Sequence, residues 1–108
     1  MSHPLTPLEK IPEITRRILS VSNPRRIILF GSYARGDFGP HSDLDLLVIE
    51  DEIDSVNDET QRLYQAMSGL EIPVDIVVAR TSYIERYGDL IGSVVHPALR
   101  EGKVIYGR

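Results

Sequence analysis

Four short apolar runs of strand type, separated by stretches with helical periodicity, constrain the fold of this chain most strongly. The runs cover residues 26–30, 44–49, 73–79 and 104–106. They are nearly continuous rather than alternating, which is typical of strands that are covered on both faces. Strands that alternate with helices predict an α/β (α+β) fold, with a mixed β-sheet of about four strands flanked by helices.

The stretch before the first strand predicts a helix that ends ahead of Pro24. Its apolar stripe consists of Ile11, Ile14, Ile18 and Leu19. Thr6 and Glu9 have the spacing of a capping box, but a proline inside a helix costs about 3 kcal/mol. The regular helix can therefore begin as late as Pro12.

Further helices are expected between and after the later strands. Leu63, Tyr64, Met67 and Leu70 form the apolar stripe of the first of these. Thr81 or Ser82 is expected to cap a short helical turn around Ile84 and Tyr87, and Gly102 to end a helix that follows residues 94–99. The five tyrosines (Tyr33, Tyr64, Tyr83, Tyr87 and Tyr106) are interpreted as packing residues.

Length and composition indicate one ordinary soluble domain over residues 1–108. No apolar run approaches the ~20 residues of a membrane span, and the N-terminus does not resemble a secretory signal. The absence of cysteine is compatible with a reducing compartment, so we expect a cytoplasmic protein without a membrane partner. A net charge of −4 argues against direct nucleic-acid binding. It does not exclude a nucleotide substrate, because metal ions can supply positive charge.

Asp43 and Asp45 stand at the head of the second apolar run. Side chains alternate along a strand, so both carboxylates point to the same side, with Cα atoms about 7 Å apart. Asp75 interrupts another apolar run and is expected to be buried there, where an unpaired carboxylate is costly. Three such aspartates suit Mg²⁺ or Mn²⁺. Two simpler interpretations remain open: turn chemistry for the pair, and an arginine partner for Asp75.

A glycine-rich loop, GSYARGDFGPH, joins the first two strands. Gly31 lets the backbone approach a ligand closely, and Ser32 is expected to cap a short helix whose start favours phosphate. Arg35 either steadies a triphosphate or holds a loop carboxylate such as Asp37. A tight turn without a ligand would explain Gly31 and Ser32 equally well if they stood alone.

Together, "GSYARG" and "SDLDLLV" resemble the signature of the nucleotidyltransferases of the DNA polymerase β superfamily. Within that superfamily the chain is similar to the minimal nucleotidyltransferases (MNT proteins) of bacteria and archaea over nearly its whole length. The resemblance implies that Gly31 and Ser32, with Arg35, bind the phosphates of ATP or another nucleoside triphosphate. It also implies that Asp43, Asp45 and Asp75 hold two Mg²⁺ ions, with Mn²⁺ as an alternative.

The resemblance also implies a reaction and a partner. An acceptor hydroxyl attacks the α-phosphate while pyrophosphate leaves, and Asp75 helps to deprotonate that hydroxyl. Small members commonly pair with a HEPN-family protein as a toxin–antitoxin system, in some cases by adenylylating a toxin tyrosine. The leading expectation is thus an antitoxin that transfers AMP to a HEPN partner.

Two alternatives remain: a non-catalytic antitoxin that masks its partner by binding, and a nucleotidyltransferase acting on a small molecule such as an antibiotic. The acceptor, the base specificity and the state of association (homo- or hetero-oligomer) stay open on the sequence.

Overall fold

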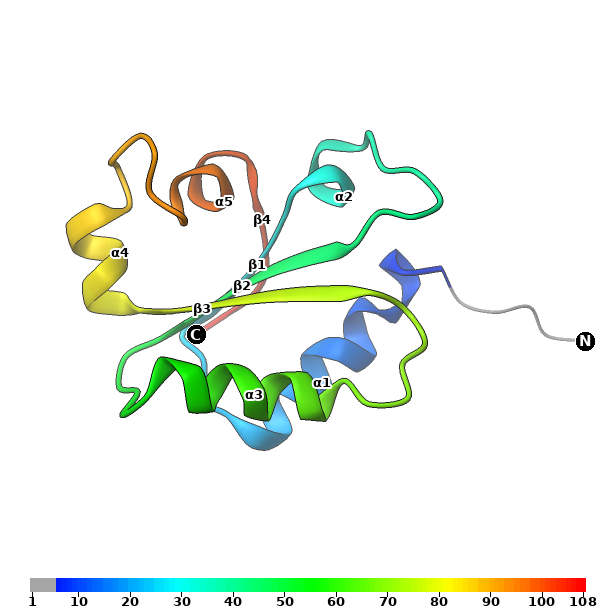
Figure 1. Cartoon of the computed structure of the whole chain (residues 1–108), viewed down its shortest axis with the longest axis horizontal. Coiled ribbons are helices and arrows are strands. Elements are labelled where there is room, and N and C mark those ends of the chain that lie inside the picture. Colours follow the sequence, from blue (N-terminus) through cyan, green and yellow to red (C-terminus); the bar gives the residue numbers. More distant parts are fainter. Residues whose placement is uncertain (1–5) are drawn as a thin grey trace, which may run out of the picture.

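The computed structural model describes residues 6–108 and is built around one four-stranded sheet with strand order β3-β2-β1-β4 (Figure 1). The strands are β1 (Arg26–Phe30), β2 (Leu44–Glu50), β3 (Val74–Arg80) and β4 (Lys103–Gly107). β1 pairs antiparallel with both β2 and β4, whereas β2 and β3 are parallel. The predicted mixed sheet is confirmed, with strand bounds within one residue of those expected from the sequence.

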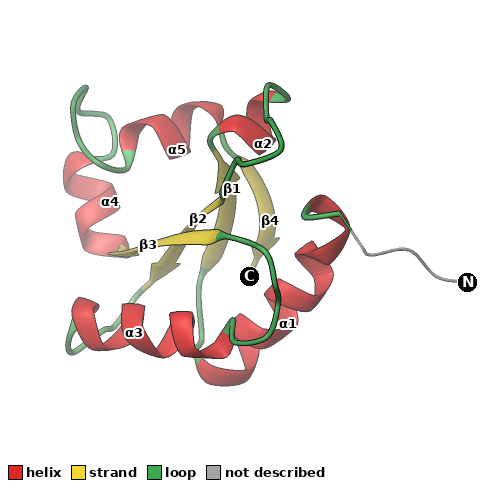
Figure 2. Cartoon of the chain, turned by 45° about the vertical axis from the view of Figure 1, so that its right-hand side comes forward, coloured by secondary structure: helices red, strands yellow, loops and turns green. Residues whose placement is uncertain are grey.

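Helices cover both faces of this sheet (Figures 1 and 2). On one face lie α1 (Ile11–Val21) and α3 (Val56–Ala66), and on the other lie α4 (Thr81–Tyr87) and α5 (His96–Glu101). The short α2 (Ser32–Arg35) follows β1, and its buried Tyr33 and Ala34 belong to the same apolar cluster as α1 and α3. A parallel pair needs a long crossover, and α3 supplies it between β2 and β3. Within residues 6–108, no helix combines the length and the apolar character that crossing a membrane requires.

Two apolar clusters divide the side chains of β2 between these faces. Leu44, Leu46 and Val48 are buried in one cluster with Ile14 and Ile18 of α1 and Leu63 of α3. Leu47 and Ile49 are buried in the other, with Val95 and with Ala98 of α5. Because side chains alternate along a strand, Asp45 lies on the same face as Leu47. The carboxylate thus lies on the face that α4 and α5 cover, away from α1 and α3.

The N-terminal capping box is confirmed. The Glu9 N–H donates to Thr6 Oγ1 at 3.2 Å, and the Thr6 N–H donates to Glu9 Oε1 at 3.1 Å. This reciprocal pair precedes a 3₁₀ turn, η1 (Leu8–Lys10), that runs into α1. Pro12 occupies the first turn of α1, where its missing N–H has no helical partner to lose.

The expected cap of α4 is wrong. The helix begins at Thr81 itself, and its N-cap, Arg80, makes no capping hydrogen bond through its side chain. The Thr81 hydroxyl instead donates to Asp51 Oδ1 at 2.6 Å. Thr81 is already helical, so its hydroxyl does not stand at the N-cap position from which a side chain accepts the first free N–H groups.

Candidate active site

The glycine-rich loop makes its turn at Gly31, directly after β1. Gly31 has φ +75° and ψ −155°, a conformation that is essentially restricted to glycine, and it is the N-cap residue of α2. Ser32 is the first residue of this helix rather than its cap, so that prediction is wrong. No side chain caps α2; the chain reverses at Gly36, where the Ser32 carbonyl accepts the N–H groups of Gly36 and Asp37 at 2.8 and 3.1 Å.

Gly31 lies in close contact with Asp45. A Cβ atom at Gly31 would overlap Asp45 Oδ2 and would lie 3.0 Å from Asp45 Cγ. The contact follows from the sheet, because Phe30 is the partner of Asp45 in the antiparallel β1–β2 pair. The loop that resembles a phosphate cradle and one of the predicted metal ligands are therefore parts of one site.

Asp75 joins this site from the neighbouring strand. Asp45 and Asp75 are directly paired in the parallel register of β2 and β3, so their side chains stand on the same face. Asp43 is exposed, one residue before β2 begins. Burial raises the pKa of the Asp45 carboxyl, and the negative charges of Asp75 and Asp43 raise it further, while Arg35 acts in the opposite direction. The three predicted aspartates are thus close enough for the charges of Asp43 and Asp75 to affect the pKa of Asp45.

The expectation that Asp75 is buried is wrong. β3 is an edge strand, and the Asp75 residue on it is exposed. The apolar run around Asp75 is explained by Ile76, Val78 and Ala79, which are buried against the rest of the domain. A strand at the edge of a sheet can leave its first residues in solvent, so no buried cation is needed to balance this carboxylate.

Tyr64 of α3 is a site residue that the sequence pattern missed. Its hydroxyl donates to Asp75 Oδ1 at 3.0 Å and accepts the N–H of Ile76 at 2.8 Å. The side chain belongs to the predicted apolar stripe of its helix, which led to its interpretation as a packing residue. A tyrosine in such a stripe can, however, carry its polar hydroxyl past the core, and this property was the available signal in the sequence.

Arg35 pairs with carboxylates of the protein itself. Its Nε lies 3.2 Å from Asp37 Oδ2, and one terminal nitrogen lies 3.5 Å from Glu101 Oε2. These contacts agree with the alternative in which Arg35 holds a loop carboxylate. Both pairs are exposed, so each is weak and can open toward an incoming phosphate.

The three aspartates have the right donor atoms for a hard divalent cation, since Mg²⁺ and Mn²⁺ prefer oxygen ligands. Within residues 6–108, no three acidic or histidine side chains are gathered tightly enough to hold an ion as they stand. The three aspartates therefore fit a divalent cation in their oxygen donors and in their mutual repulsion, which a cation would relieve. A Mg²⁺ site usually takes only one or two carboxylates together with substrate phosphates, which suits a site that is completed by its nucleotide.

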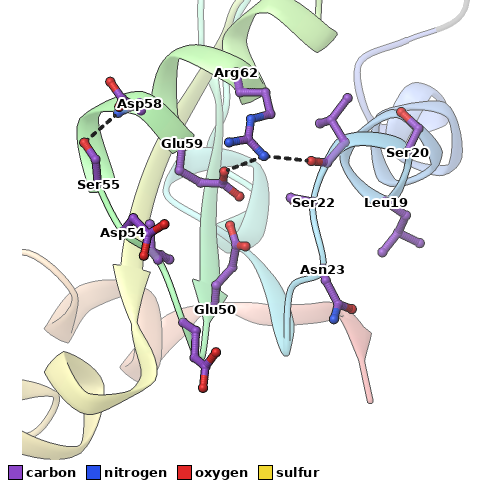
Figure 3. A pocket seen from close by; sticks show the side chains of 13 residues that line it. Leu19, Ser20, Ser22, Asn23, Glu50, Asp54, Ser55, Asp58, Glu59 and Arg62 are labelled. Carbon is purple, nitrogen blue, oxygen red and sulfur yellow. Dashed lines mark hydrogen bonds and ion pairs between the residues drawn. The ribbon is translucent and has the colours of Figure 1, made fainter.

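A separate acidic cavity of about 620 Å³ lies beyond the other end of β2 (Figure 3). Glu50 and Glu59 are buried beside it, and Arg62 approaches Glu59 Oε1 at 3.3 Å. Burial raises the pKa of Glu50 to about 8, together with the adjacent Glu59 carboxylate, to which a protonated Glu50 can donate. The candidate active site is at the aspartates and not at this cavity, because Asp45 lies against the loop that resembles a phosphate cradle.

Residues 8–96 match the family model described as the nucleotidyltransferase domain. A protein of Methanocaldococcus jannaschii named "putative protein adenylyltransferase" is 33% identical over 94 residues, which is 75% of this chain and 94% of the relative. The chain therefore belongs to the nucleotidyltransferase domain family, as the GSYARG and SDLDLLV segments predicted.

Two solved structures share the fold. A "putative nucleotidyltransferase" from Sulfolobus solfataricus matches with a TM-score of 0.67 at 24% identity, over 94% of this chain and 80% of that one. A toxin–antitoxin crystal structure with AMP-PNP matches with a TM-score of 0.56 at 22% identity, over 90% of this chain and 73% of that one. At these identities the two likenesses establish the fold alone.

Proposed function

We propose that this protein is a metal-dependent nucleotidyltransferase that moves AMP from ATP to a hydroxyl group of a protein partner. One observation carries the proposal: Asp45 lies against Gly31 on one side and is paired with Asp75 on the other. A phosphate-binding turn and a set of carboxylates for metal ions are the two parts that nucleotidyl transfer requires, and the sheet register joins them at one residue.

The residues take the following roles in this proposal. Gly31 and Ser32 bind the triphosphate through the backbone at the turn, and Arg35 exchanges its exposed carboxylate partners for a phosphate. Asp43, Asp45 and Asp75 hold two Mg²⁺ ions, or Mn²⁺ in their place. Bound metal supplies charge stabilisation for the attacking and leaving oxygens.

The reaction is an in-line substitution at the α-phosphate. The acceptor oxygen forms its bond to phosphorus as the bond to the pyrophosphate oxygen breaks. Asp75 receives the acceptor proton, for which it is well placed because it is exposed at the edge of the sheet. Pyrophosphate then leaves, and the partner retains an AMP group.

We further propose that the acceptor is a tyrosine of a HEPN-family toxin in the cytoplasm, and that the protein acts as its antitoxin. Support comes from the relative named for protein adenylyltransferase activity and from the fold shared with a toxin–antitoxin protein. The openness of Asp43 and Asp75 to solvent is consistent with an acceptor delivered by a second protein.

The test is to incubate the purified protein with Mg²⁺, α-labelled ATP and the product of the neighbouring gene. Label on that product, lost in the double variant Asp43→Asn/Asp45→Asn, is the expected result. Neutralisation of the partner that survives the double substitution would favour masking by contact. Transfer to a small hydroxyl compound without the protein partner would favour the third alternative. The absence of transfer in every arm contradicts the proposal.

A further inference from the structure

Tyr64 approaches the aspartates from the opposite side of the sheet. Its helix, α3, packs with α1 on one face, whereas Asp45 and Asp75 belong to the other face. Leu63, the preceding residue, is fully buried against the sheet, but Tyr64 is 41% exposed. The Tyr64 side chain therefore passes around the open edge of β3 rather than into the core.

The hydroxyl of Tyr64 satisfies two groups of the edge strand at once. The Ile76 N–H, which has no strand beyond it to pair with, donates to this hydroxyl at 2.8 Å. The phenol has a single proton, and it can be given either to Asp75 Oδ1 at 3.0 Å or to the Ile76 carbonyl at 3.5 Å. The shorter bond to a charged acceptor is the stronger one, so the proton is assigned to Asp75.

From this geometry we propose that Tyr64 is a positioning residue for the third carboxylate, an inference that rests on the proposed function. The backbone of Ile76 fixes the hydroxyl, and the hydroxyl fixes Oδ1 of Asp75. Within the described residues, no other side chain donates a hydrogen bond to this carboxylate. The exposed Asp75 is thereby oriented before metal and nucleotide bind. Without this hydrogen bond its side chain would rotate freely, and binding would have to restrict that rotation.

Tyr64 is not assigned as an acceptor of AMP. Burial raises the pKa of the phenol, and so do the hydrogen bond to Asp75 and the negative charges of Asp75 and Asp43, whereas the Ile76 N–H acts in the opposite direction. The net increase disfavours the phenolate that would attack a phosphate. The role is thus distinct from that of an acceptor tyrosine.

The test compares Tyr64→Phe, which removes only the hydroxyl, with Tyr83→Phe in α4, a matched exposed tyrosine at 38% exposure. Mn²⁺ affinity is measured by electron paramagnetic resonance without nucleotide. Loss of a group that orients a ligand typically costs 10–100-fold in metal affinity or activity. We expect a loss of this size for Tyr64→Phe and none for Tyr83→Phe, with kcat reduced and the KM for ATP nearly unchanged.

A second measurement reports the geometry without metal or substrate. The exchange of the Ile76 amide proton should accelerate in Tyr64→Phe, while the amides of β1 keep their protection. In an Asp75→Asn background, Tyr64→Phe should cause no further loss of Mn²⁺ affinity, because the group that it positions is gone.

The outcomes separate the two proposals. Wild-type transfer with unchanged Mn²⁺ affinity and kcat in Tyr64→Phe overturns the positioning role and leaves the proposed function standing. AMP found on Tyr64 by mass spectrometry also overturns it. A wild-type protein that neither binds Mn²⁺ nor transfers label refutes both proposals together.

Discussion

Replacing Gly31 by alanine tests the close contact between Gly31 and Asp45 on which the candidate site depends. Two costs are expected. The backbone at φ +75° and ψ −155° is strained for any residue with a Cβ, by about 1–3 kcal/mol. The new methyl group would also meet Asp45, and forcing an extra carbon into a packed position costs typically about 1–3 kcal/mol. The free energy of unfolding should therefore fall by about 2–6 kcal/mol.

Gly36 provides the matched control in the same loop. It also has a positive φ, +89°, but a Cβ added there would have no atom within 4 Å. Gly36→Ala should therefore lower the free energy of unfolding by only about 1–2 kcal/mol, the cost of a left-handed backbone conformation for a residue with a Cβ. Urea denaturation measures both losses, and calorimetric titration with ATP measures nucleotide affinity. Gly31→Ala should abolish nucleotide binding.

A double-mutant cycle isolates the steric contribution to the destabilisation caused by Gly31→Ala. In an Asp45→Ala background the methyl group at position 31 has room. Gly31→Ala should therefore lower the free energy of unfolding by about 1–3 kcal/mol less there than in the wild-type protein. Equal losses for Gly31→Ala and Gly36→Ala, with no relief from Asp45→Ala, would refute the close contact between the loop and the carboxylate.

Three further variants have defined outcomes. Asp45→Asn should abolish transfer yet raise the melting temperature, since it removes a charge whose burial and whose repulsion from Asp75 and Asp43 are unfavourable; an unchanged or lower melting temperature would contradict this. Glu50 has a pKa raised to about 8 in the fold, against an ordinary value of 4.5, so its contribution to stability is present below pH 4.5 and is lost as pH rises to 8. Glu50→Gln should flatten that decline in pH-dependent urea denaturation, and an unaltered slope would exclude Glu50 as its source. Leu63→Ala, at a fully buried position of α3, should cost about 2–5 kcal/mol by the same method, and a loss below 1 kcal/mol would mean that α3 is not packed on the sheet as described.

The fold was largely predictable because its signals are local. Apolar runs mark strands, and glycine and proline mark their ends, so the four strands were placed to within a residue. The pairing of Asp45 with Asp75 could not be read from either segment alone. It depends on the parallel register of β2 and β3, which the α3 crossover and tertiary packing set.

Two misplaced details, the exposure of Asp75 and the role of Tyr64, share a physical cause, which is that burial depends on strand order. The apolar residues around Asp75 suggested a buried strand, but an edge strand keeps one side open. The same open edge leaves the Ile76 N–H free for Tyr64, a residue 12 positions away in the chain. No spacing rule connects a helix residue to the outer edge of a strand, so this contact required the structure.

The central claim is that the three aspartates and Gly31 form a site for nucleotidyl transfer. The most direct measurement incubates the protein, Mg²⁺ and the product of the neighbouring gene with ATP labelled at either the α- or the γ-phosphate, and follows the label by gel and mass spectrometry. Our account predicts that the α-label alone becomes bound to the acceptor and that Asp43→Asn/Asp45→Asn abolishes it. Transfer of the γ-label, or α-label transfer that survives this double substitution, would contradict the account.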